Sequence, residues 1–171
     1  MVNKNNGFTL LELIIVTAII ALLATASIAI LNPFGQFQKA RDTRVKSDLS
    51  QIQKALESYY QDYGRYPANA TGCTYVMLGN NGDGNDCIEW GKSWQPYMNI
   101  VPQDPTSSNR YVYYLASGGQ AYYIYANLSR GTKDQQVCQN LNANGECPSV
   151  PWTNLCGTKC NFGVSSPNVT P

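Results

Sequence analysis

Residues Phe8 to Leu31 read FTLLELIIVTAIIALLATASIAIL, and this stretch decides the fold. A helix of this length rises about 36 Å, which is enough to cross a hydrocarbon core of about 30 Å. No comparable apolar run follows Leu31. The sequence therefore predicts a chain that enters a membrane at its N-terminal end and is otherwise soluble. The few polar residues of the stretch are Thr9, Glu12, Thr17, Thr25 and Ser27.

The overall composition excludes several classes of function. Only 13% of the 171 residues are charged and the formal net charge is +1, against about 25% charged residues in a typical soluble domain. Residues 64–171 carry six basic and six acidic side chains, so no nucleic-acid partner is indicated. The chain has no histidine, which excludes Ser-His-Asp, Cys-His and histidine–zinc chemistry. No carboxylate pair can be assigned to a cleft, and we expect no enzyme.

Three interpretations of the apolar segment compete. The first is a cleaved secretory signal, because Lys4 precedes the segment and Ala24-Thr25-Ala26 fits a cleavage site. The second is a plain membrane anchor, and the third is an assembly helix that other copies of the chain later cover. Glu12 bears on the choice, since a carboxylate inside a membrane segment is costly and usually functional. The ordinary interpretation of Glu12 is that its side chain reaches the membrane–water interface and interacts favourably with the helix dipole.

The run Gly7-Phe8-Thr9-Leu10-Leu11-Glu12, followed by the apolar helix, resembles the leader of type IV pilins and pseudopilins. The resemblance implies that a membrane prepilin peptidase cuts between Gly7 and Phe8 and that Phe8 is then methylated. Glu12 becomes the fifth residue of the mature chain and can pair with the new amine of a neighbouring copy, which offsets the desolvation of both charges. Asn6 precedes Gly7 where the family has Lys or Arg.

The helix is expected to continue through residues 32–63. Pro33 and Gly35 are expected to kink it near its start. Asp42 and Lys46 form an i,i+4 pair that we expect on a solvated face. Apolar residues at spacings of four and three predict that another face packs on a sheet. These residues are Val45, Leu49, Ile52, Leu56, Tyr59 and Tyr63.

Residues 64–171 are expected to form a head outside the membrane. Two tyrosine-rich runs flank Ser117-Gly118-Gly119-Gln120 and predict a hairpin over 111–128. Its tyrosines suit a sheet with one packed face and one wet face. From residue 129 onward no periodicity is visible. The predicted fold class is α+β: a long N-terminal helix, membrane-spanning in its first half, packs on a small antiparallel sheet as in type IV pilins, with a disulfide-stapled irregular C-terminal region.

The cysteines predict an oxidising compartment, and hence a head outside the cytoplasm. Four basic residues lie within 39–46, on the C-terminal side of the apolar segment. The positive-inside rule, taken alone, would place that side in the cytoplasm. No Cys-x-x-Cys occurs, so a zinc site is poorly supported. The sequence-local pairing is Cys73–Cys87, Cys138–Cys147 and Cys156–Cys160.

One segment is a candidate calcium loop. Residues 80–86 carry oxygen-bearing side chains at alternate positions, with Asp83 and Asp86 as candidate ligands. Asp86 stands where an EF-hand has Gly, and the alternative is a solvated turn. No other cofactor is expected. The major pseudopilin of type II secretion, which the resemblance includes, has an acidic calcium loop after its last strand. Residues 129–136 are not acid-rich, which counts against that subtype.

We therefore expect a non-enzymatic subunit of a type IV pilus-like filament. The resemblance implies a single-pass membrane prepilin, surrounded by lipid before assembly, that the peptidase cleaves. Assembly machinery in the membrane then builds copies into a helical filament at the cell surface or in the periplasm. The alternative within the family is the major pseudopilin of type II secretion. The alternative from another class is a membrane-anchored or secreted disulfide-rich binding module.

Overall fold

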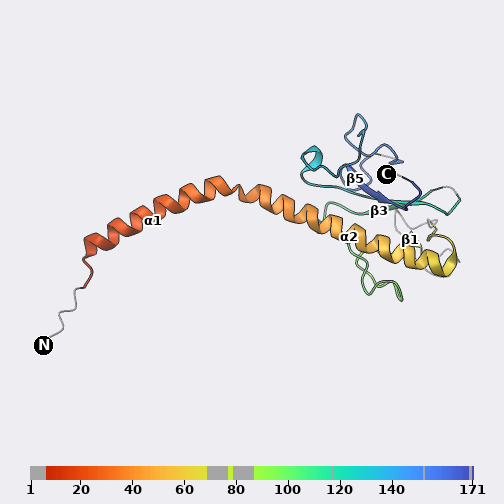
Figure 1. Ribbon diagram of the computed structural model, residues 1–171, viewed down its shortest axis with the longest axis horizontal. Coiled ribbons are helices and arrows are strands. Elements are labelled where there is room, and N and C mark those ends of the chain that lie inside the picture. Colours follow the sequence, from red (N-terminus) through yellow and green to blue (C-terminus); the bar gives the residue numbers. More distant parts are fainter. Residues whose placement is uncertain (1–6, 69–76, 79–86, 117, 152, 170) are drawn as a thin grey trace. The chain divides into compact units, whose positions relative to one another are not determined.

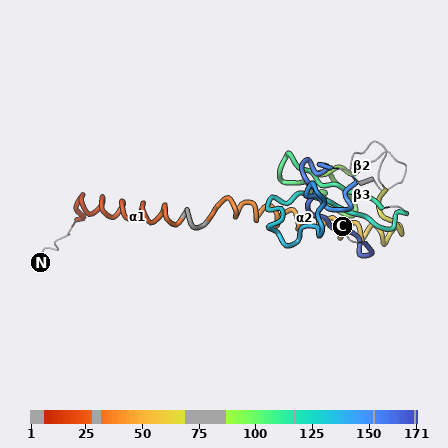
Figure 2. Tube along the Cα trace, turned by 90° about the horizontal axis from the view of Figure 1, so that it is seen from above, coloured from red at the N-terminus to blue at the C-terminus, as the bar shows by residue number. Residues whose placement is uncertain are grey.

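The computed structural model describes residues 7–68, 77–78, 87–116, 118–151, 153–169 and 171, and the side chains of these except 28–31 and 77–78. The chain divides into two compact units, Met1–Phe37 and Gln38–Pro171. The second unit is called the head below. Figure 1 shows the order of the elements along the chain, and Figure 2 shows the same trace from above.

Two helices follow each other with one residue between them. Helix α1 (Leu10–Leu31) ends at Asn32, whose backbone is left-handed with φ 41°, and helix α2 (Pro33–Tyr63) begins directly after it. The Asn32 side chain accepts a hydrogen bond from the Gly35 N–H at 3.3 Å. Pro33 is thus the first residue of α2, where its missing N–H costs nothing. The expected interruption is present, but it lies at Asn32, and Gly35 is inside α2.

The head contains a three-stranded antiparallel sheet in the order β3–β4–β5. Strands β3 (Val112–Leu115) and β4 (Tyr122–Ala126) form the predicted hairpin, closed by the Ala116 N–H to the Ala121 carbonyl at 2.8 Å. Strand β5 (Phe162–Ser165) pairs with β4 and comes from a region without periodicity. Sequence analysis also missed the short pair β1 (Met77–Leu78) and β2 (Cys87–Ile88).

The main core lies between α2 and one face of this sheet. The predicted stripe of α2 is buried from Val45 to Tyr59, whereas Tyr63 is 47% exposed and stacks on Tyr59 at 4.5 Å between ring centres. From the sheet, side chains at alternate positions meet the stripe, as the pleat requires. They are Tyr113, Leu115, Tyr122, Ile124, Ala126, Phe162 and Val164.

The opposite face of the sheet is not the wet face that the tyrosines predict. Val112 and Tyr125 are fully buried there, under a second cluster that includes both described disulfides and Leu155. Tyr114 and Tyr123 remain partly exposed, with ring centres 6.4 Å apart. The irregular C-terminal region therefore acts as a cover for this face. Its covering residues are far from the hairpin in sequence, which is why local pattern did not reveal it.

Candidate functional site

The predicted cleavage position lies in non-helical backbone. Gly7, Phe8 and Thr9 precede the first helical residue, and the Phe8 side chain is 89% exposed. Among the described residues, no atom beyond its chain neighbours lies within 4 Å of where a Cβ on Gly7 would stand. A peptidase needs access to the backbone outside a helix, and this junction lies outside α1. The roles of Gly7 and Phe8 stay predictions.

Glu12 closes the N-terminal end of α1. Its backbone N–H donates to the Thr9 hydroxyl at 3.2 Å, and its Oε2 accepts from the Thr9 N–H and hydroxyl, each at 3.0 Å. This arrangement is a capping box. Its sequence signature, Thr-x-x-Glu, could have predicted the start of the helix. Among the described contacts only Oε2 is engaged, so Oε1 is open to a cation. The carboxylate can thus cap its own helix and face a neighbour.

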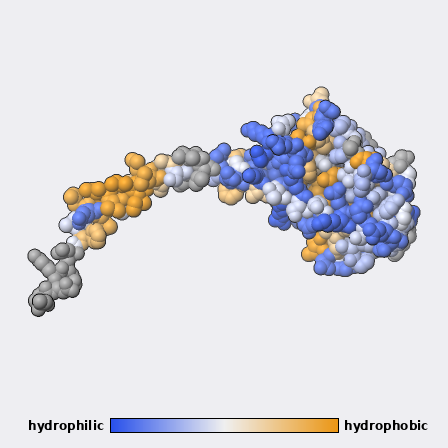
Figure 3. All heavy atoms as spheres, in the orientation of Figure 1, coloured by the Kyte–Doolittle hydropathy of each residue, from blue (hydrophilic) through white to orange (hydrophobic). Residues whose placement is uncertain are grey.

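The surface of α1 is apolar all round. Residues Leu10–Ser27 form a helix segment long and apolar enough to cross a membrane, and none of that segment is buried within the described chain. Figure 3 shows mostly hydrophobic residues on the visible face of this segment, with hydrophilic ones near its N-terminal end. A signal sequence near an N-terminus has the same properties. Exposure of such a surface to water is unfavourable, so lipid or other protein chains must cover it.

The segment after β4 is attached to α2 by charged side chains. Asp42, 1% exposed, accepts hydrogen bonds from the Ser129 N–H at 2.7 Å and the Arg130 N–H at 3.0 Å. Lys46 forms a salt bridge of 2.7 Å with Asp134. The expected solvated Asp42–Lys46 pair is therefore wrong, because each residue binds this distant segment. A short 3-10 turn, η1 (Gly131–Lys133), lies within the segment.

The salt bridge changes the acidity of Asp134. Burial raises the pKa of this carboxyl, but the Lys46 hydrogen bond, the Gln136 N–H and the charges of Lys46 and Arg130 outweigh it and lower the pKa below the usual 3.8. A lowered folded-state pKa contributes stability above the unfolded pKa and loses it as pH falls. This contact therefore stabilises the head at neutral pH.

The candidate calcium ligands Asp83 and Asp86 lie outside the described residues. Within the part of the chain that the structure describes, no cluster of three or more acidic or cysteine side chains could hold a metal. The calcium prediction for residues 80–86 therefore stays a prediction.

Two disulfides hold the covering segment, and both were predicted. Cys138–Cys147 and Cys156–Cys160 are formed, each with Cα atoms 5.3 Å apart. Cys87 is also disulfide-bonded, while Cys73, its predicted partner, lies outside the described residues. Loops closed by bonds of this kind stabilise the folded state mainly by restricting the unfolded chain.

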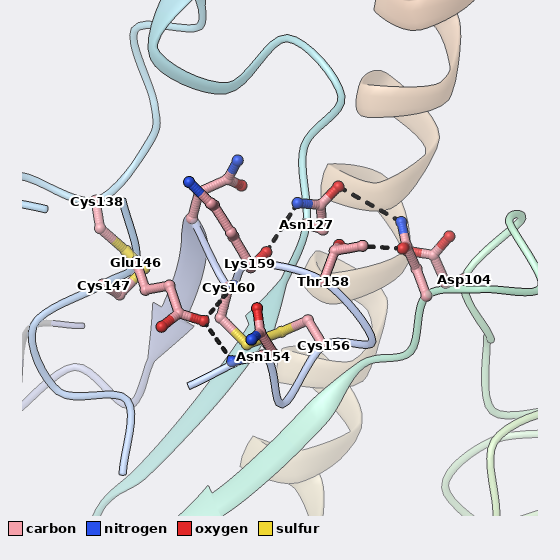
Figure 4. Close-up of a disulfide and its surroundings, with 12 residues drawn as sticks. Asp104, Asn127, Cys138, Glu146, Cys147, Asn154, Cys156, Thr158, Lys159 and Cys160 are labelled. Carbon is pink, nitrogen blue, oxygen red and sulfur yellow. Dashed lines mark hydrogen bonds between the residues drawn. A yellow bond between two sulfur atoms is a disulfide. The ribbon is translucent and has the colours of Figure 1, made fainter. Parts of the chain in front are cut away.

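Glu146 organises the backbone between these disulfides. It is 1% exposed, and its Oε1 accepts from the Asn154 N–H at 2.7 Å and the Cys160 N–H at 3.4 Å. Asn127 links the same segment to the end of β4 by donating to the Lys159 carbonyl at 2.8 Å. Figure 4 shows Glu146 pointing between the two disulfides. No local sequence signal marks Glu146, because the groups it binds are eight and fourteen residues away.

Tyrosine hydroxyls of the head donate to carboxylates of α2. Tyr111 donates to Asp48 at 2.9 Å, and Tyr97 donates to Asp62 at 2.7 Å. Asp48 is 8% exposed, and its burial raises the pKa of the carboxyl even though the Tyr111 hydrogen bond and the Arg44 charge lower it. The tyrosines thus hold α2 to the segments that precede the sheet by polar contacts as well as by packing.

The raised pKa of Asp48 predicts a pH effect. In the folded state Asp48 holds its proton more tightly, so the free energy of unfolding falls as pH rises from the usual pKa of 3.8 through the raised value. We expect Asp48→Asn to stabilise the chain at neutral pH by on the order of 1 kcal/mol, because Asn avoids the buried charge and can still accept from Tyr111.

Denaturant unfolding at a series of pH values measures this difference, which should vanish in acid below the usual pKa. A variant that is less stable than the wild type by the same amount at every pH would contradict the argument.

Comparison with known proteins gives the family. Residues 32–144 match the family "Type II secretion system (T2SS), protein G", and residues 2–28 match the "Prokaryotic N-terminal methylation motif". The type II secretion system core protein G of Klebsiella pneumoniae is 34% identical over 119 residues, which cover 68% of this chain and 78% of that protein. The protein of the same name from Aeromonas hydrophila is 36% identical, over 68% of this chain and 76% of its own length. That from Pseudomonas aeruginosa is 27% identical, over 84% of this chain and 87% of its own length. No solved structure matches the chain significantly. The chain therefore belongs to the type II secretion system protein G family, with a prepilin-type methylation motif at its N-terminus.

Proposed function

We propose that this protein is the pseudopilin subunit of a type II secretion system. It enters the membrane as a prepilin through α1, with its head outside the cytoplasm. A prepilin peptidase removes Met1–Gly7 and methylates Phe8. The secretion machinery then moves subunits out of the lipid into a periplasmic fibre in which the α1 helices cover one another. The protein acts by assembling and has no catalytic role.

One observation carries this proposal: most of the capped, strongly apolar helix α1 lies within the match to the methylation motif, and its segment Leu10–Ser27 is not covered by the rest of the described chain. An apolar helix leaving lipid must be covered at once, which drives subunits together. The free Oε1 of Glu12 supports a role in docking, since a neighbouring copy's new amine at Phe8 is the cation it would meet. Such an ion pair forms favourably only when both charges are in register.

The comparisons favour a secretion subunit over the type IV pilus subunit that we expected first. The absence of an acid-rich loop at residues 129–136 had counted against the secretion subunit. In this chain, however, Asp42 and Lys46 attach that segment to α2 by direct hydrogen bonds and a salt bridge. The missing acidic residues are therefore a poor criterion for the subtype.

Deleting the gene in its native host tests the subtype. We expect exported enzymes to accumulate in the periplasm and surface pili to remain, with secretion restored by the wild-type gene supplied in trans. A strain that secretes normally but has lost its surface pili would contradict the proposal and support the pilus subunit.

A further inference from the structure

The head carries exposed positive charge where α2 enters it. Lys39 is exposed and lies on the same face of α2 as Asp42 and Lys46, which follow it at spacings of three and seven residues. The segment bound to that face adds Arg130 and Lys133. Lys46, Arg130 and Lys133 line one open hollow of about 350 Å³, together with Asp134 and two glutamines. We call Lys39, Lys46, Arg130 and Lys133 the basic cluster.

Contacts between α2 and the segment after β4 fix the geometry of the basic cluster. The Asp42 carboxylate holds the backbone N–H groups of Ser129 and Arg130, and the Lys46–Asp134 salt bridge holds the other end of the turn. Arg41 also donates to the Ser129 hydroxyl. The turn η1 therefore lies beside α2 (Figures 1 and 2). Among the described contacts, the hydrogen bonds and the salt bridge of this attachment do not involve the side chains of Arg130 and Lys133.

The carboxylates near the basic cluster are buried or paired. Asp42 lies beneath the turn, and Asp104, 8% exposed, binds Arg41 at 3.2 Å. The basic cluster has four positive charges, and the carboxylates of Asp42 and Asp134 balance two of them. The cations are more exposed to solvent than these two carboxylates. Figure 3 shows strongly hydrophilic surface at this end of the head. An anionic partner would meet cations there.

We propose that the basic cluster binds the phosphate groups of anionic phospholipids in the membrane that holds α1. Lys39 and Lys46 follow the last residue of α1 by only eight and fifteen residues, so the chain keeps the basic cluster near the headgroup layer, whose charges act over a Debye length of about 8–10 Å. Each cation near an anionic surface strengthens binding about fivefold. The contact would hold the head on the bilayer before assembly. It also gives a role to Lys39 and Lys46, whose charges the positive-inside rule would place in the cytoplasm. It rests on the membrane-bound state of the proposed function.

Hydrogen exchange of the full-length protein in nanodiscs tests this binding. We expect amides of residues 128–136 to exchange more slowly in nanodiscs that contain phosphatidylglycerol than in nanodiscs of phosphatidylcholine alone, with the difference lost in high salt. Arg130→Gln/Lys133→Gln should weaken the protection about fivefold for each cation removed. Lys54→Gln/Lys92→Gln removes the same charge from exposed positions outside the basic cluster and should keep the protection.

Three results would overturn the inference. Equal protection of the amides in both lipids would mean that the basic cluster does not bind anionic lipid. Equal loss of protection in both double variants would mean the same. Protection that appears only when several copies associate would make the cluster a subunit contact. In each case the proposed function stands, since the protein is still in the nanodisc. A chain that fails to enter nanodiscs at all would overturn both proposals.

Discussion

Replacing Glu12 by Ala is expected to abolish fibre assembly while leaving the head folded. The change removes the carboxylate that accepts from the Thr9 N–H and hydroxyl, but the Thr9 hydroxyl can still cap the backbone N–H of residue 12. In the proposed fibre it also leaves the Phe8 amine of a neighbouring copy without a partner, which for a buried charge costs about 3–5 kcal/mol. That loss alone reduces assembly more than a hundredfold. Electron microscopy of fibres and the melting temperature of the head measure the two parts of the prediction.

Two further variants separate capping from docking. Glu12→Gln keeps an oxygen that can accept from the Thr9 N–H but has no charge, and we expect it to fail in assembly as Ala does. Thr17→Val serves as the control in the same helix, because the Thr17 hydroxyl bonds only to the carbonyls of Leu13 and Ile14 among the described residues. It should assemble normally. Normal fibres from Glu12→Gln would show that the charge is not needed.

Gly157→Ala is expected to destabilise the head by about 3 kcal/mol or more. Gly157 has φ +82°, and a Cβ at this position would overlap the Ser108 carbonyl oxygen. The backbone there cannot move away freely, since the Arg110 N–H donates to the Cys156 carbonyl at 3.0 Å and Cys156 is tied to Cys160. Thermal unfolding should show a melting temperature lower by roughly 10 °C.

Gly118→Ala is the matched control for this prediction. Gly118 has φ +90°, but no atom lies within 4 Å of its missing Cβ. Ala at this position meets only the cost of left-handed backbone, about 1–2 kcal/mol. Equal losses in the two variants would mean that the close approach at Ser108 contributes nothing and that the covering segment is loosely packed.

Local patterns predicted the elements that depend on neighbours in sequence. The stripe from Val45 to Tyr59 determined which face of α2 is buried, and the glycine pair at 118–119 determined the hairpin. The near pairs Cys138–Cys147 and Cys156–Cys160 were also found. Periodicity and turn chemistry act over a few residues, and so these features are visible in the chain itself.

Contacts between distant segments were not predictable in this way. Strand β5 pairs along the edge of β4, and its four residues are too short a run for their alternation to predict a strand. Asp42 looked like a solvated partner of Lys46, but it caps backbone groups 87 and 88 residues away. The outer face of the sheet looked wet because its cover begins beyond residue 137. Each of these errors has the same cause: burial by remote residues overrides local polarity.

The N-terminal residue and intact mass of the mature protein from its native host test the central claim most directly. We predict a chain that starts at methylated Phe8 and whose mass shows all six cysteines oxidised. A chain that starts at Ser27 would identify an ordinary secreted protein and would contradict the whole account of assembly through α1 and Glu12. An uncut chain starting at Met1 would also contradict it, because no amine would then exist at Phe8 for Glu12 to meet.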